Sequence, residues 1–192
     1  RLTFAKPERE NCDGYAYDPE NPSQHIIDMS ENEIEVPEDY TREELRQDLL
    51  CYTSPVLKED LVLTGDMTAE LYISSDAPDT DFVVRVTDVD ENGRSIKLAD
   101  GLLSARYRNG FAQSEFLQEG EIVCLKIRTT KLSNCFRKGH RIRVTVTSSA
   151  KNFIFPNSNT REGFASARTV VAHNRVYHGG LHASRLTVRV EP

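Results

Sequence analysis

The chain has 192 residues, of which 38% are hydrophobic and 8% aromatic, so it is long and apolar enough for one packed core. This composition excludes general disorder and collagen-like repeats, and no apolar run approaches the roughly 20 residues that a transmembrane helix needs. The net charge of −6 is uneven: residues 1–60 carry 16 acidic and 6 basic side chains, and residues 61–192 carry 14 and 18. We therefore predict an acidic N-terminal arm, residues 1–60, that belongs to the same domain as a mildly basic body, residues 61–192.

The arm is rich in Pro, Asp, Glu and Asn, and it is predicted to be irregular apart from one short helix from Thr41 to Leu50. Thr41 and Glu44 have the spacing of a capping box, in which each side chain bonds a free backbone N–H at the start of a helix. Leu45 and Leu49 give this helix one apolar edge. No other regular element is expected in the arm.

From Leu61 onward apolar and polar residues alternate, which is the pattern of half-buried β-strands. Strands are predicted at residues 67–73, 82–89, 95–99, 123–127, 142–146, 169–177 and 186–190. Asn92-Gly93 favours a tight hairpin turn between the second and third of these, because both residues tolerate positive φ. About eight strands with hardly any helix indicate an all-β fold, a two-sheet antiparallel β-sandwich of the jelly-roll type, since two sheets must cover each other's apolar faces.

The segment from Ala150 to Ala167 breaks this alternation and carries the phenylalanines Phe153, Phe155 and Phe164. Leaving these side chains in water is unfavourable, so the loop is predicted to cover either the edge of the sandwich or another domain. Both alternatives stay open from the sequence.

Motifs of several enzyme classes are absent. No two glycines lie four residues apart, as they do in the G-x-S-x-G nucleophile turn of α/β-hydrolases, and the glycine motifs that bind phosphates and dinucleotides are also missing. Basic residues alternate with apolar ones, as in Arg141-Ile142-Arg143-Val144, which is typical of the solvent face of a strand and argues against a nucleic-acid partner. The sequence predicts no nucleotide chemistry and assigns no catalytic residue.

Three histidines, His173, His178 and His182, lie close enough in sequence to suggest a metal site. No Cys or carboxylate stands beside them at a ligand-like spacing, and histidines in a strand and its following loop point in different directions. Hydrogen-bonded structural histidines are therefore favoured, and we expect no metal or cofactor here.

Asp76, Asp79 and Asp81 form an acidic cluster that could bind calcium through oxygen ligands. Aspartates at such spacing more commonly stabilise turns by bonding nearby backbone groups, which is the interpretation we favour. By the same argument Arg106 and Arg108, two residues apart, are predicted to alternate on one strand as solvated or surface-paired side chains.

The four cysteines, Cys12, Cys51, Cys124 and Cys135, include no C-x-x-C pair, and a chain of this length needs no disulfide to stabilise it. Free thiols are predicted, which favours a reducing, cytoplasmic location. No membrane partner is expected.

Longer motifs along the chain resemble those of one known family. The matching segments are Tyr15-x-Tyr17-Asp18-Pro19-x-x-Pro22, Asp48-Leu49-Leu50-x-Tyr52-x-Ser54-Pro55, Ser75-Asp76-Ala77-Pro78-Asp79-Thr80-Asp81-Phe82, Gly101-Leu102-Leu103-Ser104-Ala105-Arg106-Tyr107-Arg108 and Phe136-x-x-Gly139-His140-Arg141. With them the sequence resembles the C-terminal domain of X-prolyl dipeptidyl-peptidases and cocaine-esterase-like hydrolases, the CocE/NonD family. The resemblance implies a jelly roll of the galactose-binding-like type.

In that family the nucleophile, aspartate and histidine of a serine hydrolase lie in a preceding α/β-hydrolase domain, and none of those positions exists in this chain. The resemblance implies a noncatalytic domain, inactive alone, that packs on the catalytic domain of the same polypeptide and helps to shape a pocket for a small peptide or ester substrate. The fold alone leaves two alternatives, a free-standing carbohydrate-binding or adhesion module and an enzyme with an unrecognised triad.

Candidate residues for the pocket wall or the domain interface come from the arm and from the long loop. They are Tyr15, Tyr17, Ser23, His25, Phe153, Phe155 and Phe164. The chain departs from the family pattern after Pro22, where residues 23–28 replace a continuation that contains Pro-Thr and a glycine pair. Because irregular, Pro-rich segments are typical of binding loops, residues 23–28 are predicted to face the active site of the intact enzyme and to affect substrate preference.

Overall fold

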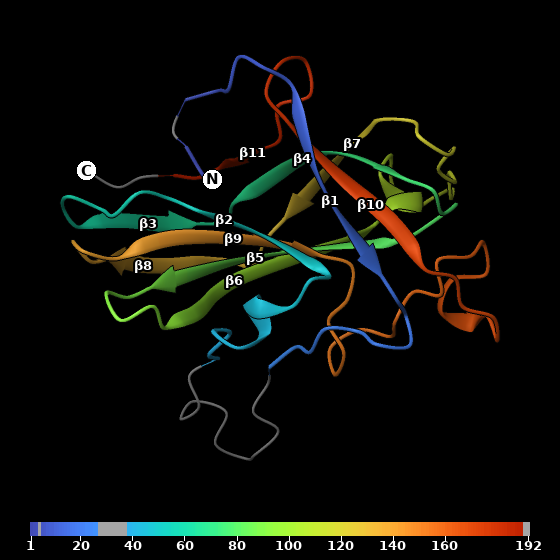
Figure 1. Cartoon of the computed structure of the whole chain (residues 1–192), viewed down its shortest axis with the longest axis horizontal. Helices are drawn as coiled ribbons and strands as arrows, with labels where there is room; N and C mark the ends of the chain where they lie inside the picture. The colour runs from blue at the N-terminus through green and yellow to red at the C-terminus, as the bar shows by residue number, and fades with distance from the viewer. Residues whose placement is uncertain (4, 27–37, 190–192) are drawn as a thin grey trace.

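The computed structural model describes residues 1–3, 5–26 and 38–189, and most regular structure in them is extended (Figure 1). The strands are β1 (Asn11–Tyr17), β2 (Leu49–Thr53), β3 (Leu61–Gly65), β4 (Thr68–Ser75), β5 (Asp81–Val89), β6 (Ser95–Ser104), β7 (Val123–Arg128), β8 (Leu132–Phe136), β9 (Arg141–Thr147), β10 (Ala172–His178) and β11 (Arg185–Thr187). Short 3-10 helices lie in the connections: η1 (Glu43–Leu45), η2 (Ala105–Tyr107) and η3 (Gly163–Ala165). Among the described residues no helix is both long and apolar enough to cross a membrane.

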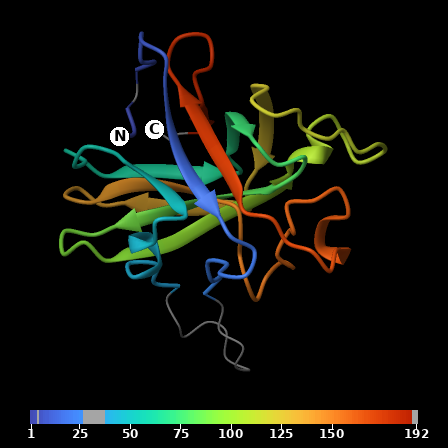
Figure 2. The same cartoon turned by 45° about the vertical axis from the view of Figure 1, so that its right-hand side comes forward.

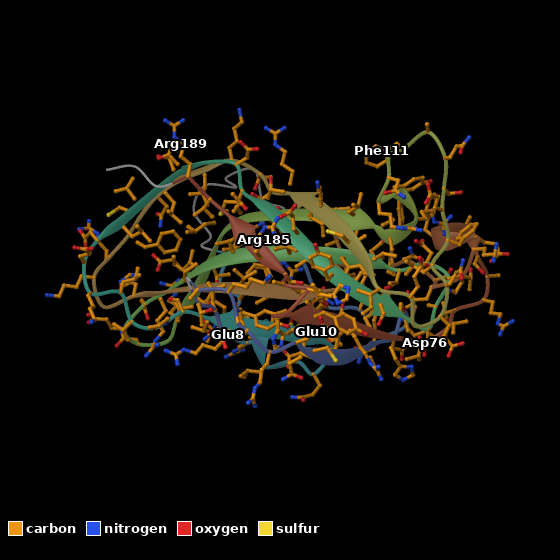
Figure 3. All side chains as sticks on the ribbon, turned by 90° about the horizontal axis from the view of Figure 1, so that it is seen from above. Glu8, Glu10, Asp76, Phe111, Arg185 and Arg189 are labelled. Atoms are coloured by element: carbon orange, nitrogen blue, oxygen red, sulfur yellow. The ribbon has the colours of Figure 1, made fainter. Side chains whose placement is uncertain are left out.

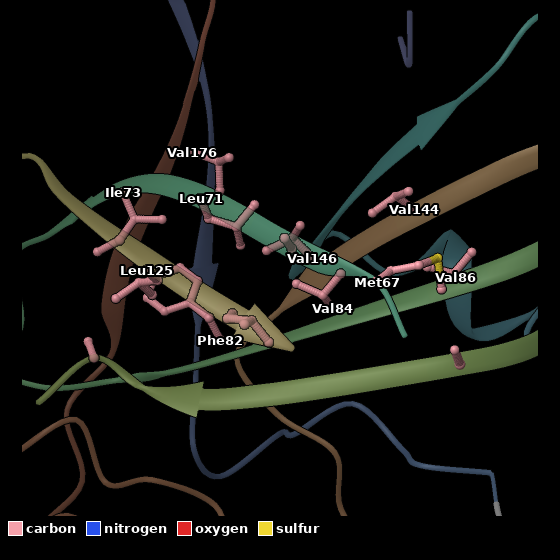
Figure 4. Close-up of a cluster of buried hydrophobic side chains, with 14 of the residues drawn as sticks. Met67, Leu71, Ile73, Phe82, Val84, Val86, Leu125, Val144, Val146 and Val176 are labelled. Atoms are coloured by element: carbon pink, nitrogen blue, oxygen red, sulfur yellow. The ribbon is translucent and has the colours of Figure 1, made fainter. Parts of the chain in front are cut away.

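The strands form two antiparallel sheets around one core. The first sheet has the order β1-β10-β4-β11, with β7 also paired to β4, and the second has the order β2-β9-β5-β6. A separate two-stranded ladder joins β3 and β8. Val84 and Val146 of the second sheet belong to one buried cluster with Leu71 and Val176 of the first (Figure 4). The predicted all-β, two-sheet antiparallel β-sandwich is confirmed.

The hairpin between β5 and β6 forms at the predicted Asn-Gly turn. Gly93 has a φ of 85°, and the Asp90 carboxylate accepts hydrogen bonds from the backbone N–H groups of Asn92 (2.8 Å) and Arg94 (2.9 Å). The turn therefore supplies the positive φ and the local hydrogen bonds that set the strand register. Strand β6 continues to Ser104, beyond the predicted end at residue 99.

The arm is more regular than predicted, because it contributes an edge strand to each sheet. Strand β1 pairs with β10 along its whole length, from Asn11 opposite His178 to Tyr17 opposite Ala172. Strand β2 pairs with β9 in the same antiparallel way. Neither strand has the clear alternation of a half-buried strand, so the pairing with distant strands decides their conformation.

The predicted helix from Thr41 to Leu50 is wrong. Only the single turn η1 forms, and β2 begins at Leu49. The two residues of the expected capping box bond elsewhere: the Thr41 hydroxyl donates to Asp39 (2.6 Å), and the Glu44 carboxylate accepts from the Ser95 hydroxyl (2.8 Å). Glu44 also pairs with Arg143 of β9. These contacts with the second sheet replace the helix cap.

The arm covers the outer face of the second sheet (Figures 1 and 2). The Tyr40 N–H donates to the Ser95 carbonyl (2.8 Å), and the Lys97 N–H donates to the Glu38 carbonyl (3.0 Å), so the arm extends this sheet beyond β6. Strand β5 lies beneath it and is buried at almost every position, including the Arg85 side chain. The sandwich therefore has a third layer, held largely by polar contacts.

Candidate domain interface

The candidate residues Tyr15 and Tyr17 of β1 lie in the core. Both are buried, and the Tyr15 and Ser148 hydroxyl oxygens are 2.8 Å apart. Burial raises the pKa of both phenols, so they stay protonated. Both tyrosines are enclosed by their own domain and so help to form its core, and the interface role predicted for them stays a prediction.

Ser23 joins the arm to the loop after β9. Its N–H donates to the Ser149 hydroxyl (2.8 Å), and its own hydroxyl donates to the Ser149 carbonyl (2.8 Å). Gln24 then forms a parallel bridge with Lys151, whose N–H donates to the Ser23 carbonyl (2.9 Å). Ser23 is itself fully buried, so its hydrogen bonds hold the arm against the loop after β9.

His25 is enclosed by charged and aromatic side chains. Its ring stacks on Phe153, with centroids 4.6 Å apart and planes 20° apart. Nε2 lies 3.3 Å from the Lys97 ammonium, and Nδ1 lies 3.6 Å from an Asp100 carboxylate oxygen. Burial and the Lys97 charge lower the pKa of His25, and the Asp100 charge opposes them. The imidazole is therefore neutral near pH 7.

The three phenylalanines of the long loop are exposed, and we call them the aromatic face. Phe153 is 52% exposed, Phe155 79% and Phe164 75%. The rings of Phe155 and Phe164 stack on each other with centroids 5.9 Å apart. Phe155 and Phe164 therefore do not cover the edge of the sandwich, the first of the two predicted alternatives, whereas Phe153 is half covered by His25. The first part of the loop that carries them passes beside the arm segment that follows β1 in both views, and Gln24 bridges Lys151 there (Figures 1 and 2).

A buried ion pair fixes the loop that carries Phe164. Arg106 lies in η2, not on a strand as predicted, and its Nε donates to the fully buried Asp79 carboxylate (2.7 Å). The same side chain donates to the Thr160 carbonyl (3.1 Å), and the Asn157 amide also donates to Asp79 (2.7 Å). This network ties the β4–β5 turn, the end of β6 and the long loop into one unit.

Residues 5–187 match the family described as the X-Pro dipeptidyl-peptidase C-terminal non-catalytic domain. The chain belongs to this family. Cocaine esterase of Rhodococcus sp. (strain MB1 Bresler) is 35% identical over 188 residues, which cover 94% of this domain and 32% of that esterase. A putative serine esterase of Mycobacterium bovis is 33% identical over 161 residues, which cover 74% of this domain and 24% of that protein. The domain thus spans about a third or less of these relatives.

Solved structures share the fold of this non-catalytic domain. An aminopeptidase from the marine sediment archaeon Thaumarchaeota archaeon matches with a TM-score of 0.91 at 24% identity, over 98% of this domain and 35% of that chain. An α-amino acid ester hydrolase matches with a TM-score of 0.85 at 22% identity, over 94% and 32%. The resemblance predicted from the motifs is confirmed, and so is the assignment as a noncatalytic domain of CocE/NonD-type hydrolases.

The histidines of the C-terminal part of this non-catalytic domain each bind a different carboxylate. His173 lies 2.7 Å from Asp76, and His178 lies 3.1 Å from Asp13. His182 bonds Glu10 (3.0 Å), which Figure 3 shows beside β1. Within the described ranges no three His, Cys, Asp or Glu side chains gather closely enough to hold a metal ion.

The three aspartates of the acidic cluster also bond different partners. Asp76 binds His173, while Asp79 and Asp81 both accept from the Asn157 amide. Asp79 also pairs with the half-buried Arg106, which goes beyond the turn-stabilising role we predicted for it. Sequence reasoning missed this pair. The turn pairs Val89 with Ser95, but a register shift between Val86 and Thr87 is also needed to put Asp81 opposite Ser104 and so to bring Asp79 near Arg106.

Proposed function

We propose that this non-catalytic domain packs on an α/β-hydrolase catalytic domain of the same polypeptide and helps to shape that domain's substrate pocket. The observation that carries the proposal is the aromatic face, since Phe155 and Phe164 are more than 70% exposed and already stacked. Large apolar side chains grouped on a surface mark an interaction site. A curated relative with about three times the length of this domain provides room for such a partner.

The charges around the aromatic face suggest what the partner surface is like. Lys151 and Arg161 are exposed next to the phenylalanines, with Glu162 as an exposed acid beside them. Two surfaces that dock on each other are complementary in charge as well as in shape, so basic residues on one face acidic residues on the other. We therefore expect an apolar patch with a mainly acidic rim on the catalytic domain.

The reaction we assign to the intact enzyme is transfer of an acyl group to water, that is, hydrolysis of a small ester or peptide. Support comes from the relatives, two of which are named as esterases, and from the family name, which refers to a dipeptidyl-peptidase. The nucleophile, the aspartate and the histidine would come from the catalytic domain.

The first test reads the gene upstream of Arg1 for a G-x-S-x-G segment followed by an aspartate and a histidine. The full-length product and the isolated domain are then assayed side by side with a p-nitrophenyl ester. We expect hydrolysis by the full-length enzyme alone. A start codon close to Arg1 together with glycan binding by the isolated domain would instead support the carbohydrate-binding module. Hydrolysis by the isolated domain, lost on a single Ser or His substitution, would support a self-contained enzyme.

Residues 23–28 are proposed to affect substrate preference. Residues 23–26 lie against the loop that carries Phe153, while Ile27 and Asp28 lie outside the described residues. Exchanging residues 23–28 in the full-length enzyme for a Pro-Thr-Gly-Gly-type segment should change the ratio of kcat/KM between a small and a bulky ester. An equal ratio before and after the exchange would contradict the proposal. Exchange of the hairpin turn at residues 91–93, which connects β5 to β6, is the matched control.

We also propose that the protein is cytoplasmic and has no nucleic-acid or membrane partner. All four cysteines are free, which suits a reducing compartment, and the net charge is negative. Fractionation of the source cells would test the location, and recovery in the membrane or secreted fraction would contradict it.

A further inference from the structure

His25 lies where the arm meets the loop that carries Phe153. Its backbone N–H donates to the Lys151 carbonyl (2.8 Å), and its ring stacks on Phe153. The next residue, Ile26, donates its N–H to the Tyr40 hydroxyl (2.9 Å). His25 therefore belongs to the segment proposed to face the substrate pocket, and its side chain contacts the aromatic face.

The polar partners of the His25 ring require one protonation state. Nε2 lies 3.3 Å from the Lys97 ammonium, which can only donate, so Nε2 must be the unprotonated nitrogen. The proton is then on Nδ1, which lies 3.4 Å from the Tyr40 hydroxyl oxygen and 3.6 Å from the Asp100 carboxylate. The geometry thus fits the neutral imidazole with its hydrogen on Nδ1.

Charges on the surrounding elements decide what a second proton would do. Lys97 and Asp100 of β6 are 3.1 Å apart, and Lys97 also pairs with Glu38 of the arm. Burial opposes the charge on Lys97, but its hydrogen bond to Glu38 and the Asp100 charge outweigh burial and raise the pKa of Lys97. Arg85 of β5 lies on the same face, 4.7 Å from the Tyr40 ring. A protonated His25 would therefore have two permanent cations beside it and lose its bond with Lys97.

We propose that His25 is a positioning residue of the intact hydrolase, whose neutral imidazole holds residues 24–26 against Phe153 and so keeps the pocket-facing segment and the aromatic face in one arrangement. The proposal rests on the proposed docking of this domain. Protonation of His25 breaks the arrangement, and the substrate then binds less tightly. The effect is on KM, since no atom of His25 is assigned to the chemistry.

The test compares the full-length enzyme with its His25→Gln and His25→Phe variants across pH. A Gln side-chain oxygen can accept from Lys97 but takes up no proton, so His25→Gln should have KM within about twofold of wild type at pH 7.5. Below the pKa of His25, KM of the wild type should rise by up to about tenfold per pH unit, and His25→Gln should lack this rise. His25→Phe keeps the stacking and loses the acceptor, so its KM should be raised at every pH.

The catalytic histidine titrates equally in all three proteins, so the ratio of wild-type to variant KM isolates His25. A ratio that stays constant with pH would overturn the inference. If Phe155→Ser with Phe164→Ser also leaves the enzyme unchanged, the docking proposal fails as well; if that variant has an effect, only the role of His25 fails. As a second measurement, NMR of the imidazole nitrogens in the wild-type enzyme should show Nδ1 protonated at pH 7.5, and a hydrogen on Nε2 would overturn the inference even if the variants fail to fold.

Discussion

Replacing Asp79 by Ala is expected to destabilise the domain by about 3–5 kcal/mol, because it removes one partner of a buried ion pair and leaves the other charge uncompensated. Asp79 is fully buried and accepts from the Arg106 guanidinium (2.7 Å), the Arg106 N–H (2.9 Å) and the Asn157 amide (2.7 Å). Urea unfolding followed by far-UV circular dichroism measures the loss as a lower midpoint at unchanged slope.

Two further variants test whether the unpaired charge on Arg106 causes this loss of stability. Arg106→Met combined with Asp79→Ala should be less damaging than the sum of the single changes, since no unpaired charge is then left. Asp66→Ala is the matched control, because Asp66 pairs with Arg128 at an exposed site, where ion pairs contribute little. Equal losses in Asp79→Ala and Asp66→Ala would show that the buried network is not important for stability.

Replacing Phe155 and Phe164 together by Ser in the full-length enzyme is expected to separate the two domains. Burying each ring against a partner contributes about 1.5–3 kcal/mol, so the loss of both should lower the docking equilibrium constant by about 10²–10⁴-fold. Calorimetry should then show two transitions where the wild type shows one, and limited proteolysis should cut between the domains. The isolated domain should keep its own unfolding midpoint, because both rings are exposed in it.

Phe111→Ser is the matched control for the aromatic face. Phe111 is 80% exposed, as much as Phe155, but it projects from the β6–β7 loop (Figure 3), where its ring lies beside Tyr107 with centroids 5.5 Å apart. This substitution should leave both domains docked. If it separates them as strongly as the double substitution, or if neither has an effect, the docking surface does not lie at the long loop.

Local sequence patterns were sufficient for the central strands and their hairpin. In β5 and β9, β-branched residues fill consecutive positions, and Asn92-Gly93 supplies a turn that closes within a few residues. The unpatterned loop with Phe153, Phe155 and Phe164 could also be identified from its composition. These features depend on neighbours in the sequence, so they can be predicted without the fold.

The arm could not be predicted in this way. Glu44 has the spacing of a helix cap, but hydrogen bonds to Ser95 and Arg143, more than fifty residues away, have a stronger influence on its conformation. Strands β1 and β2 likewise form because β10 and β9 present free edges, which their own sequences do not reveal.

The sequence by itself determined the family, the all-β class and the loop that carries the aromatic face, because these follow from motifs and from local alternation. Only the tertiary structure decided which candidates are exposed. It buries Tyr15, Tyr17, Ser23 and His25 and leaves Phe155 and Phe164 in solvent. It also brings Ser23 to Ser149 and His25 to Phe153, across more than 120 residues of chain. Such contacts depend on how the sheets pack, and no short segment of the sequence encodes that packing alone.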